Sequence, residues 1–263
     1  MKFYLQYSVV LLVTLHFIVI PQNVVAQDQK SILVTGASTG IGRHLAESLA
    51  TAGYHVYAGA RKDKDLAELG AIENITAVRL DVTKQDQVDA AFAKITEKGT
   101  GLYGLVNNAG VGGGGEVVET PIEAFTDSFS EEMKPQGVSV SVVEPGNYKS
   151  HIRRSSVSRR LEKVKATGSE MTDEMKEASE ATTKRELSYK EPDEVTEAFM
   201  HALFDDNPLR RYMVVPNEKE QDMTIRTKVN ELVQLNRWGP YSYSRDELIK
   251  MLDEALSSGS SSK

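Results

Sequence analysis

The chain has 263 residues, of which 40% are hydrophobic and 26% charged, a composition ordinary for a soluble globular protein. Its formal net charge of −7 argues against a general nucleic-acid-binding protein. The sequence contains no cysteine, which excludes disulfides, thiolate nucleophiles and cysteine metal sites. One α/β domain can have this length, so the size of the chain does not require two domains.

The first segment in chain order is an apolar run over residues 9–20, followed by proline. This run is short for a membrane span, which needs roughly 20 residues. One lysine before it and small residues at Val24 and Ala26 predict a signal peptide over 1–26. Its cleavage would place the chain in the secretory pathway, the periplasm or the extracellular space. The alternative is an uncleaved anchor, through which alone the protein would contact a membrane.

Strand and helix patterns alternate from Ser31 onward. Apolar runs of the kind found in parallel sheets predict strands at 31–35, 55–60, 76–82, 101–110 (with its exit loop), 138–146 and 210–216. Helical spacing of apolar residues predicts helices at 41–52, 84–99, 191–204 and 244–256, the last opened by a Ser244–Glu247 capping box. In the second of these, Val88, Ala91, Phe92 and Ile95 should face inward. The alternation predicts an α/β fold with a parallel sheet and helices on both faces.

A glycine-rich turn, TGASTGIG at 35–42, follows the first strand and opens the first helix. A bound phosphate needs backbone N–H groups and a helix N-terminus, and side chains would block its approach. Gly36 permits the tight turn, while Gly40 and Gly42 let the backbone close on a pyrophosphate. The alternative is a tight turn without a ligand. The residues predicted to hold the diphosphate are Gly36, Ser38, Thr39, Gly40, Ile41 and Gly42.

Together with NNAG at 107–110, this turn resembles the short-chain dehydrogenase/reductase family over Ser31 to about Val215. The resemblance implies a Rossmann-type, doubly wound sheet and an NAD(P)-dependent oxidoreductase acting on a small-molecule alcohol or carbonyl. It also implies that Asp81 and Val82 contact adenine and that Asn108, Ala109 and Gly110 stabilise the sheet beside the cofactor. Pro145 and Gly146 would lie by the nicotinamide, with a hydroxyl supplied by Ser150.

The residues at the end of the second strand select between NAD and NADP. An acidic side chain there would accept hydrogen bonds from the ribose 2′-hydroxyl. This chain instead has Ala60, Arg61 and Lys62, so nothing repels a 2′-phosphate and two cations can bind it. The sequence therefore favours NADP over NAD. The alternative is that Arg61 and Lys62 are solvated charges.

The catalytic pair of the family is missing from the sequence. The resemblance implies a tyrosine acid/base with a lysine four residues later, but none of the ten tyrosines has such a lysine. The interval between Asn108 and Pro145 has room for one helix and one strand, whereas the family also places a serine-bearing strand and the tyrosine helix there. We therefore expect one central strand–helix unit to be absent, with IEAFTDSFSEEM at 122–133 as a helix fused across the deletion. Whether the flanking strands close up or leave a slot stays open.

No catalytic residue is assigned. Ser141, Tyr148 and Lys149 are the nearest imitation of the missing set, but adjacent side chains do not share a helix face. The five histidines show no metal-ligand spacing, so we predict no metal site, and His44 and His55 read as surface or packing residues.

Two functions follow from these observations. The first is the NADP-dependent oxidoreductase that the resemblance implies, and the second is an inactive truncated form or pseudoenzyme that at most binds a dinucleotide. We expect one dinucleotide-binding domain over 27–255, a lid over about 150–190 and a disordered tail over 256–263. The sequence leaves a homo-oligomer open and indicates no nucleic-acid partner.

Overall fold

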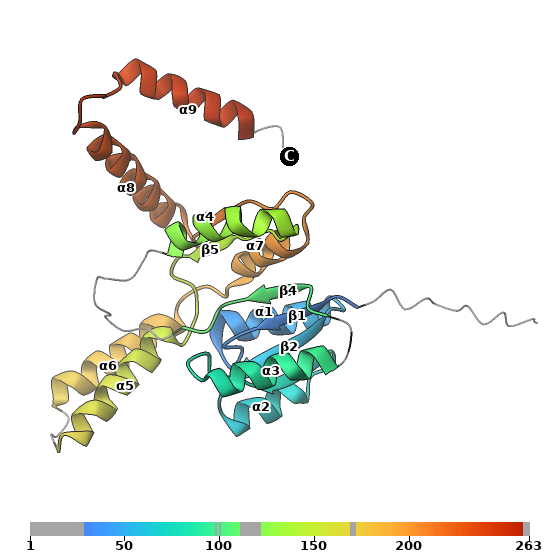
Figure 1. The fold of residues 1–263 in the computed structure, drawn as a ribbon. Coiled ribbons are helices and arrows are strands. Elements are labelled where there is room, and N and C mark those ends of the chain that lie inside the picture. Colours follow the sequence, from blue (N-terminus) through green and yellow to red (C-terminus); the bar gives the residue numbers. More distant parts are fainter. Residues whose placement is uncertain (1–28, 98, 100, 111–121, 169–171, 260–263) are drawn as a thin grey trace, which may run out of the picture.

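The computed structural model describes residues 29–97, 99, 101–110, 122–168 and 172–259 (Figure 1). The signal peptide or anchor expected over 1–26 lies outside these residues. Among the residues described, none of the helices combines the length and the apolar character that crossing a bilayer requires.

A parallel four-stranded sheet forms the first half of the protein, with the strand order β3-β2-β1-β4. Its strands are continuous apolar runs, and Ile32 and Val34 of the central strand are fully buried, as expected for a sheet covered on both faces. In the register of the sheet, Ile32 pairs with Val56 on one side and with Gly104 on the other. The strands are β1 (Ser31–Val34), β2 (His55–Ala60), β3 (Ile75–Arg79) and β4 (Gly104–Val106).

Helices cover both faces of this sheet, as the alternating pattern predicts (Figure 1). One face packs against α1 (Gly40–Thr51), α2 (Asp63–Gly70) and α7 (Asp193–Phe204), through side chains that include Leu45, Leu69 and Leu203. The other face packs against α3 (Gln85–Glu97), through Ala91 and Ile95. The inward position predicted for Phe92 is wrong, because its side chain is 71% exposed. In the described core, α3 is the one helix on this face, so no neighbouring helix covers that ring.

A separate two-stranded parallel sheet contains β5 (Val142–Pro145) and β6 (Arg211–Val214). Within the described residues, β4 pairs with β1 alone and β5 pairs with β6 alone. The strands on either side of the expected deletion therefore do not close up against each other. The strand predicted over 138–146 is shorter than expected, because only Val142–Pro145 has a partner strand. Helix α7 packs against both sheets, and Leu203 lies against Gly104 of β4.

The segment 122–133 is one continuous helix, α4 (Ile122–Met133), which continues into a 3₁₀ turn at Lys134–Gln136. The rings of Phe125 and Phe129 stack on its surface with centroids 5.4 Å apart. Two ion pairs, Asp127 with Arg211 and Glu131 with Arg210, join the helix to the β6 region. Both halves of the segment are thus compatible with a single helix in this chain.

Helices α5 (Ile152–Ala166) and α6 (Asp173–Leu187) form a hairpin over the range predicted as a lid (Figure 1). Glu186 of α6 is 1% exposed and lies at the N-terminus of α5. Its Oε1 accepts a hydrogen bond from the Arg153 backbone N–H (2.9 Å), and its Oε2 accepts one from Arg154 Nε (2.8 Å). A carboxylate at this position satisfies unpaired N–H groups of the first turn and interacts favourably with the helix dipole.

The last two helices, α8 (Glu218–Asn236) and α9 (Arg245–Gly259), extend away from both sheets and together form what we term the C-terminal arm (Figure 1). The predicted capping box is present, since the Ser244 backbone N–H donates to Glu247 Oε2 (2.8 Å) and the Glu247 backbone N–H donates to Ser244 Oγ (3.3 Å). The tail expected from residue 256 overlaps α9, which continues to Gly259. The Ser257 hydroxyl donates to the carbonyl of Asp253 (2.8 Å), a bond that the helical backbone can accommodate.

The buried carboxylate at the base of the α5–α6 hairpin gives the first prediction. Glu186→Ala should lower the free energy of unfolding by about 1–3 kcal/mol, because it leaves the Arg154 guanidinium and the α5 amides without their acceptor. Urea denaturation measures this change. Glu177→Ala, at an exposed position of the same helix, is the matched control and should change stability by less than about 0.5 kcal/mol. Equal losses in the two variants would contradict the role given to Glu186.

Candidate functional site

The carboxyl ends of β1, β2, β3 and β4 meet at one edge of the four-stranded sheet, because all four strands are parallel. The predicted dinucleotide residues follow these ends in turn, with the glycine turn after β1, Arg61 after β2, Asp81 and Val82 beyond β3, and Asn108–Gly110 after β4. In open α/β sheets this edge is where ligands bind. The structure therefore brings the residues of the first four strands to the position expected of a binding site.

Two loops approach each other too closely at this edge for side chains to fit between them. Gly36 has a φ of +66°, and a Cβ added to it would lie 2.8 Å from Ala109 Cα. A Cβ added to Gly42 would lie 2.2 Å from Asn108 Nδ2 and 2.7 Å from the carbonyl oxygen of Gly36. The sequence explains the glycine at position 42 by the close approach of a ligand. The structure adds that this glycine makes room for the Asn108 side chain.

Hydrogen bonds between Thr35 and Asn108 hold the two loops together. Asn108 Nδ2 donates to the carbonyl oxygens of Thr35 (3.0 Å) and Gly36 (3.2 Å). The Thr35 hydroxyl donates to the carbonyl of Val106 (3.3 Å) and accepts from the backbone N–H of Ala109 (2.9 Å). Through this network, which we term the Thr35–Asn108 latch, Asn108 joins the loops after β1 and β4. The family resemblance implies such a stabilising role for this residue.

The N-terminus of α1 opens onto the same edge. Thr39 is the N-cap residue, yet its side chain makes no capping hydrogen bond, and the first turn has no acidic residue. The N–H groups of a first turn have no partner inside the helix, and the helix dipole adds partial positive charge there. Gly40, with a φ of +61°, carries no side chain over this end. The arrangement has the features of an anion-binding helix N-terminus.

Arg61 extends from the end of β2 with its side chain 61% exposed, and its Nη1 lies 4.0 Å from Asp81 Oδ2. Asp81 is held by a turn, since its Oδ1 accepts hydrogen bonds from the Thr83 hydroxyl (2.8 Å) and the Thr83 backbone N–H (3.1 Å). These two bonds lower the pKa of Asp81, which keeps it ionised. Val82 and Lys62 are both exposed. The Arg61 guanidinium is thus weakly paired and open to solvent.

The residues beyond β5 divide between two places. Gly146 packs against β6 and α8, because a Cβ on it would lie 2.7 Å from Glu220 Oε2 and its N–H donates to the Val214 carbonyl (2.7 Å). Pro145 precedes it as the last residue of β5. Ser150, in contrast, lies at the start of α1, where a Cβ on Gly40 would be 3.2 Å from its Cα. Ser150 therefore lies against the glycine turn, whereas the contacts of Gly146 are made with the second sheet.

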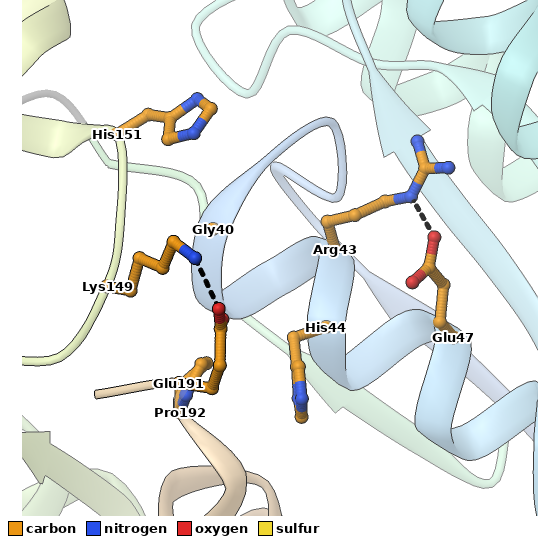
Figure 2. A pocket seen from close by; sticks show the side chains of 8 residues that line it. All are labelled: Gly40, Arg43, His44, Glu47, Lys149, His151, Glu191 and Pro192. Atoms are coloured by element: carbon orange, nitrogen blue, oxygen red, sulfur yellow. Dashed lines mark hydrogen bonds and ion pairs between the residues drawn. The ribbon is translucent and has the colours of Figure 1, made fainter. Parts of the chain in front are cut away.

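A pocket of about 200 Å³ beside Gly40 was not predicted from the sequence (Figure 2). It lies on the outward face of α1, and Figure 2 shows Lys149 paired with Glu191 and Arg43 paired with Glu47. Burial lowers the pKa of His151, which favours the neutral ring. The helical spacing of outward residues in α1 is the signal that could have indicated this surface. Its lining residues are Gly40, Arg43, His44, Glu47, Lys149, His151, Glu191 and Pro192.

The two histidines interpreted as surface or packing residues have structural partners. His44 Nδ1 lies 2.8 Å from Thr196 Oγ1, and its Nε2 lies 2.9 Å from Asp193 Oδ1, which joins α1 to α7. His55 Nε2 lies 3.2 Å from Thr76 Oγ1 on the neighbouring strand. Across the described part of the chain, no group of three or more histidine and acidic side chains could hold a metal ion.

Tyr148 does not have the geometry of a catalytic tyrosine. Its side chain is 3% exposed, and burial, followed by the charge of Glu194, raises the pKa of Tyr148 to about 12. A phenol that serves as a general acid/base needs an accessible oxygen and a pKa closer to the working pH. The adjacent Lys149 is paired with Glu191. Ser141 donates to the carbonyl of Leu209 (2.7 Å), so the three residues form no catalytic constellation.

Residues 30–129 match the family model described as short chain dehydrogenase. Estradiol 17-beta-dehydrogenase 2 from Mus musculus is 41% identical over 96 residues, which cover 34% of this chain and 25% of that protein. Mitochondrial D-beta-hydroxybutyrate dehydrogenase from Bos taurus is 28% identical over 215 residues, covering 56% of this chain and 62% of that protein. The chain thus spans less than two thirds of the length of these curated relatives.

Solved structures share the fold at low sequence identity. A short-chain dehydrogenase/reductase from Burkholderia phymatum in complex with NAD has a TM-score of 0.59 at 18% identity, covering 82% of this chain and 99% of that one. L-Sorbose reductase from Gluconobacter frateurii, complexed with NADPH and L-sorbose, has a TM-score of 0.53 at 17% identity, covering 71% and 95%. These matches confirm the Rossmann-type α/β fold class.

The close approach of the two loops gives a prediction about Gly42. Gly42→Ala should lower the free energy of unfolding by about 1–3 kcal/mol, because the new methyl group overlaps the Gly36 carbonyl and the Asn108 amide. Gly70→Ala is the matched control in a helix, since its Cβ would meet only the Ala77 Cβ at 3.7 Å. That control should leave stability unchanged or raise it by up to about 1 kcal/mol. Thermal or urea unfolding of the two variants tests the prediction, which fails if Gly42→Ala is as stable as Gly70→Ala.

Proposed function

We propose that the chain is an NAD(P)-dependent oxidoreductase of the short-chain dehydrogenase/reductase family. Its substrate would be a small-molecule alcohol or carbonyl. The observation that carries this proposal is the pair of loops after β1 and β4, closed on each other beside the N-terminus of α1, whose N-cap side chain makes no capping hydrogen bond. The bound dinucleotide would supply the hydride donor or acceptor. The two solved structures described above, with NAD in one and NADPH in the other, support a nicotinamide dinucleotide at this edge.

The fit of the site to a diphosphate rests on charge and space. The first-turn N–H groups of α1 offer hydrogen bonds to an anion. The glycines let the neighbouring loops pack closely around this end of the helix. Ser150, whose Cα and Cβ lie beside Gly40, could add a hydroxyl to this site. The residues proposed to contact the dinucleotide are Gly36, Ser38, Thr39, Gly40, Ile41, Gly42, Arg61, Asp81, Val82, Asn108, Ala109, Gly110, Pro145 and Gly146.

NADP is the dinucleotide that we propose. Arg61 projects into solvent from the end of β2, and its contact with Asp81 at 4.0 Å is long for an ion pair. Lys62 adds a second cation, and no acidic side chain occupies positions 60–62. Two cations suit a 2′-phosphate, which accepts charge-assisted hydrogen bonds.

We also propose that residues 1–26 are a signal peptide or an anchor, with the secretory or membrane-anchored location that this implies.

A second candidate function is dinucleotide binding without hydride transfer. The observation that favours it is the lack of any Tyr-x-x-x-Lys pair among the ten tyrosines of the sequence. Tyr148 offers no replacement, because it is buried and its pKa is raised to about 12. The two candidates share the cofactor site and differ in whether the chain turns over a substrate.

The cofactor proposal predicts how thermal unfolding responds to the two dinucleotides. A ligand that binds only the folded protein stabilises it by about 2.7 kcal/mol at a hundredfold excess over its dissociation constant. NADPH should raise the unfolding midpoint more than NADH at equal concentration. Arg61→Glu should weaken NADPH binding about tenfold to a hundredfold and leave NADH binding nearly unchanged, because it removes a charge-assisted bond to the 2′-phosphate.

Lys64→Glu is the control for Arg61→Glu, because it makes the same change of charge on α2 at a side chain that is 84% exposed. It should leave the NADPH response as in the unaltered chain. The NADP assignment is overturned if NADH stabilises the chain as strongly as NADPH does. The whole cofactor site is overturned if neither dinucleotide shifts the midpoint.

Turnover separates the two candidate functions. Oxidation of NADPH is followed in the presence of a panel of aldehydes and ketones, and reduction of NADP with the corresponding alcohols. If the chain binds the dinucleotide but transfers no hydride, absorbance stays constant although the thermal shift is present. If it is an active oxidoreductase, turnover appears, and Tyr148→Phe should not abolish it, since the Tyr148 oxygen is buried.

A further inference from the structure

Gln87, in the first turn of α3, makes a contact outside its own helix. Its side chain is half-buried, and its Oε1 accepts a hydrogen bond from the backbone N–H of Asp81 (2.9 Å). The nearby Gln85 is exposed and uses its amide within the helix instead, where Nε2 donates to Asp89 Oδ1 (2.9 Å). Gln87 thus ties α3 to the segment that follows β3.

The position of β3 in the sheet explains why the Asp81 N–H needs a side-chain acceptor. Within the described residues, β3 is the last strand on its side of the four-stranded sheet. The N–H of Leu80 donates to the carbonyl of Ala60 (2.9 Å) and therefore points toward β2. Successive residues of a parallel strand direct their N–H groups to opposite sides, so the N–H of Asp81 points away from β2. Gln87 supplies the acceptor that a further strand would provide.

With its backbone held by Gln87, Asp81 is fixed through its other polar groups as well. Its Oδ1 accepts hydrogen bonds from the Thr83 hydroxyl (2.8 Å) and the Thr83 N–H (3.1 Å). Its backbone carbonyl accepts one from the N–H of Lys84 (2.9 Å). The second carboxylate oxygen, Oδ2, takes part in none of these bonds and lies 4.0 Å from Arg61 Nη1. The turn therefore presents one carboxylate oxygen in a defined direction at the carboxyl edge of the sheet.

A carboxylate oxygen held in this way can distinguish purine bases. Adenine carries an amino group at C6, which donates hydrogen bonds, whereas hypoxanthine carries a carbonyl oxygen there, which accepts them. An ionised carboxylate is an acceptor only, so it attracts the amino group and repels the carbonyl oxygen. The distinction depends on where the acceptor is placed, because a hydrogen bond weakens steeply when its partners are misaligned.

We infer that Gln87 is a positioning residue for recognition of the adenine base. By accepting the Asp81 N–H, it holds the turn so that Asp81 Oδ2 meets the amino group of adenine, and it thereby sets the preference for adenine over hypoxanthine. The inference rests on the proposed dinucleotide site, in which Asp81 contacts the ligand. It adds a residue of α3 to a site otherwise built from the segments that follow the strands.

The ratio of two dissociation constants tests this role. Isothermal titration calorimetry on the full chain compares NADPH with its hypoxanthine analogue, in which a carbonyl oxygen replaces the amino group of adenine. The unaltered chain should bind NADPH about tenfold to a hundredfold more tightly, since the analogue loses a hydrogen bond to a charged group. Gln87→Leu keeps the bulk of the side chain and a high helix propensity but removes the acceptor. It should reduce the ratio to about threefold or less.

Two further variants separate positioning from a general structural role. Gln85→Leu makes the same change at an exposed position of the same turn and should keep the ratio of the unaltered chain. Gln87→Glu restores an acceptor of the same length and should recover most of the discrimination, although its charge weakens the binding of both ligands. Both constants are measured on one protein, so a general loss of stability in a variant cancels from the ratio.

The outcomes distinguish this inference from the proposed function. If NADPH binds but Gln87→Leu keeps the ratio of the unaltered chain, the role of Gln87 is overturned and the cofactor site stands. The same conclusion follows if Gln85→Leu lowers the ratio as far as Gln87→Leu does, or if the unaltered chain binds both ligands equally. If neither ligand binds the unaltered chain, the cofactor site itself is overturned, and the inference with it.

Discussion

The close contact between the loop after β1 and the loop after β4 is the constraint on which the rest of the site depends. Gly36 stands where a single added carbon would lie 2.8 Å from Ala109 Cα, and the Thr35–Asn108 latch holds the two loops at that separation. The latch uses the Thr35 hydroxyl and the side-chain amide nitrogen of Asn108, so these groups shape the edge of the sheet. The amides of the α1 N-terminus, which the latch does not use, are the groups that we propose to bind an anion.

Much of the first half of the chain could be predicted from its sequence, because local patterns determine it. The run 31–35 and the glycine turn after it are typical of a buried strand followed by a phosphate-binding turn, and the structure has β1 and α1 there. The second half was less predictable. The pairing of β5 with β6 alone depends on which strands are present elsewhere in the sheet, and residues 138–141 lack a partner although their pattern suits a strand.

Single side chains were hardest to place where their surroundings come from distant segments. Phe92 has the spacing of a core residue, yet it is exposed, because the described core holds no second helix over that face. The pocket beside Gly40 depends on Lys149, His151 and Glu191, which reach α1 from far along the chain. The burial of Tyr148 has the same origin, since no local pattern indicates that Glu194 lies beside it.

Helix α7 packs against both sheets, with Leu203 seated on Gly104 of β4 and other residues of the helix against β5 and β6. Strand pairing does not link the two sheets within the described residues, so their cooperativity passes largely through this one helix. Regions connected by few contacts open as separate units with their own free energies. The four-stranded and the two-stranded sheet can therefore unfold as separate units. The packing of α7 decides whether hydrogen exchange detects one global opening of the protein or two separate openings.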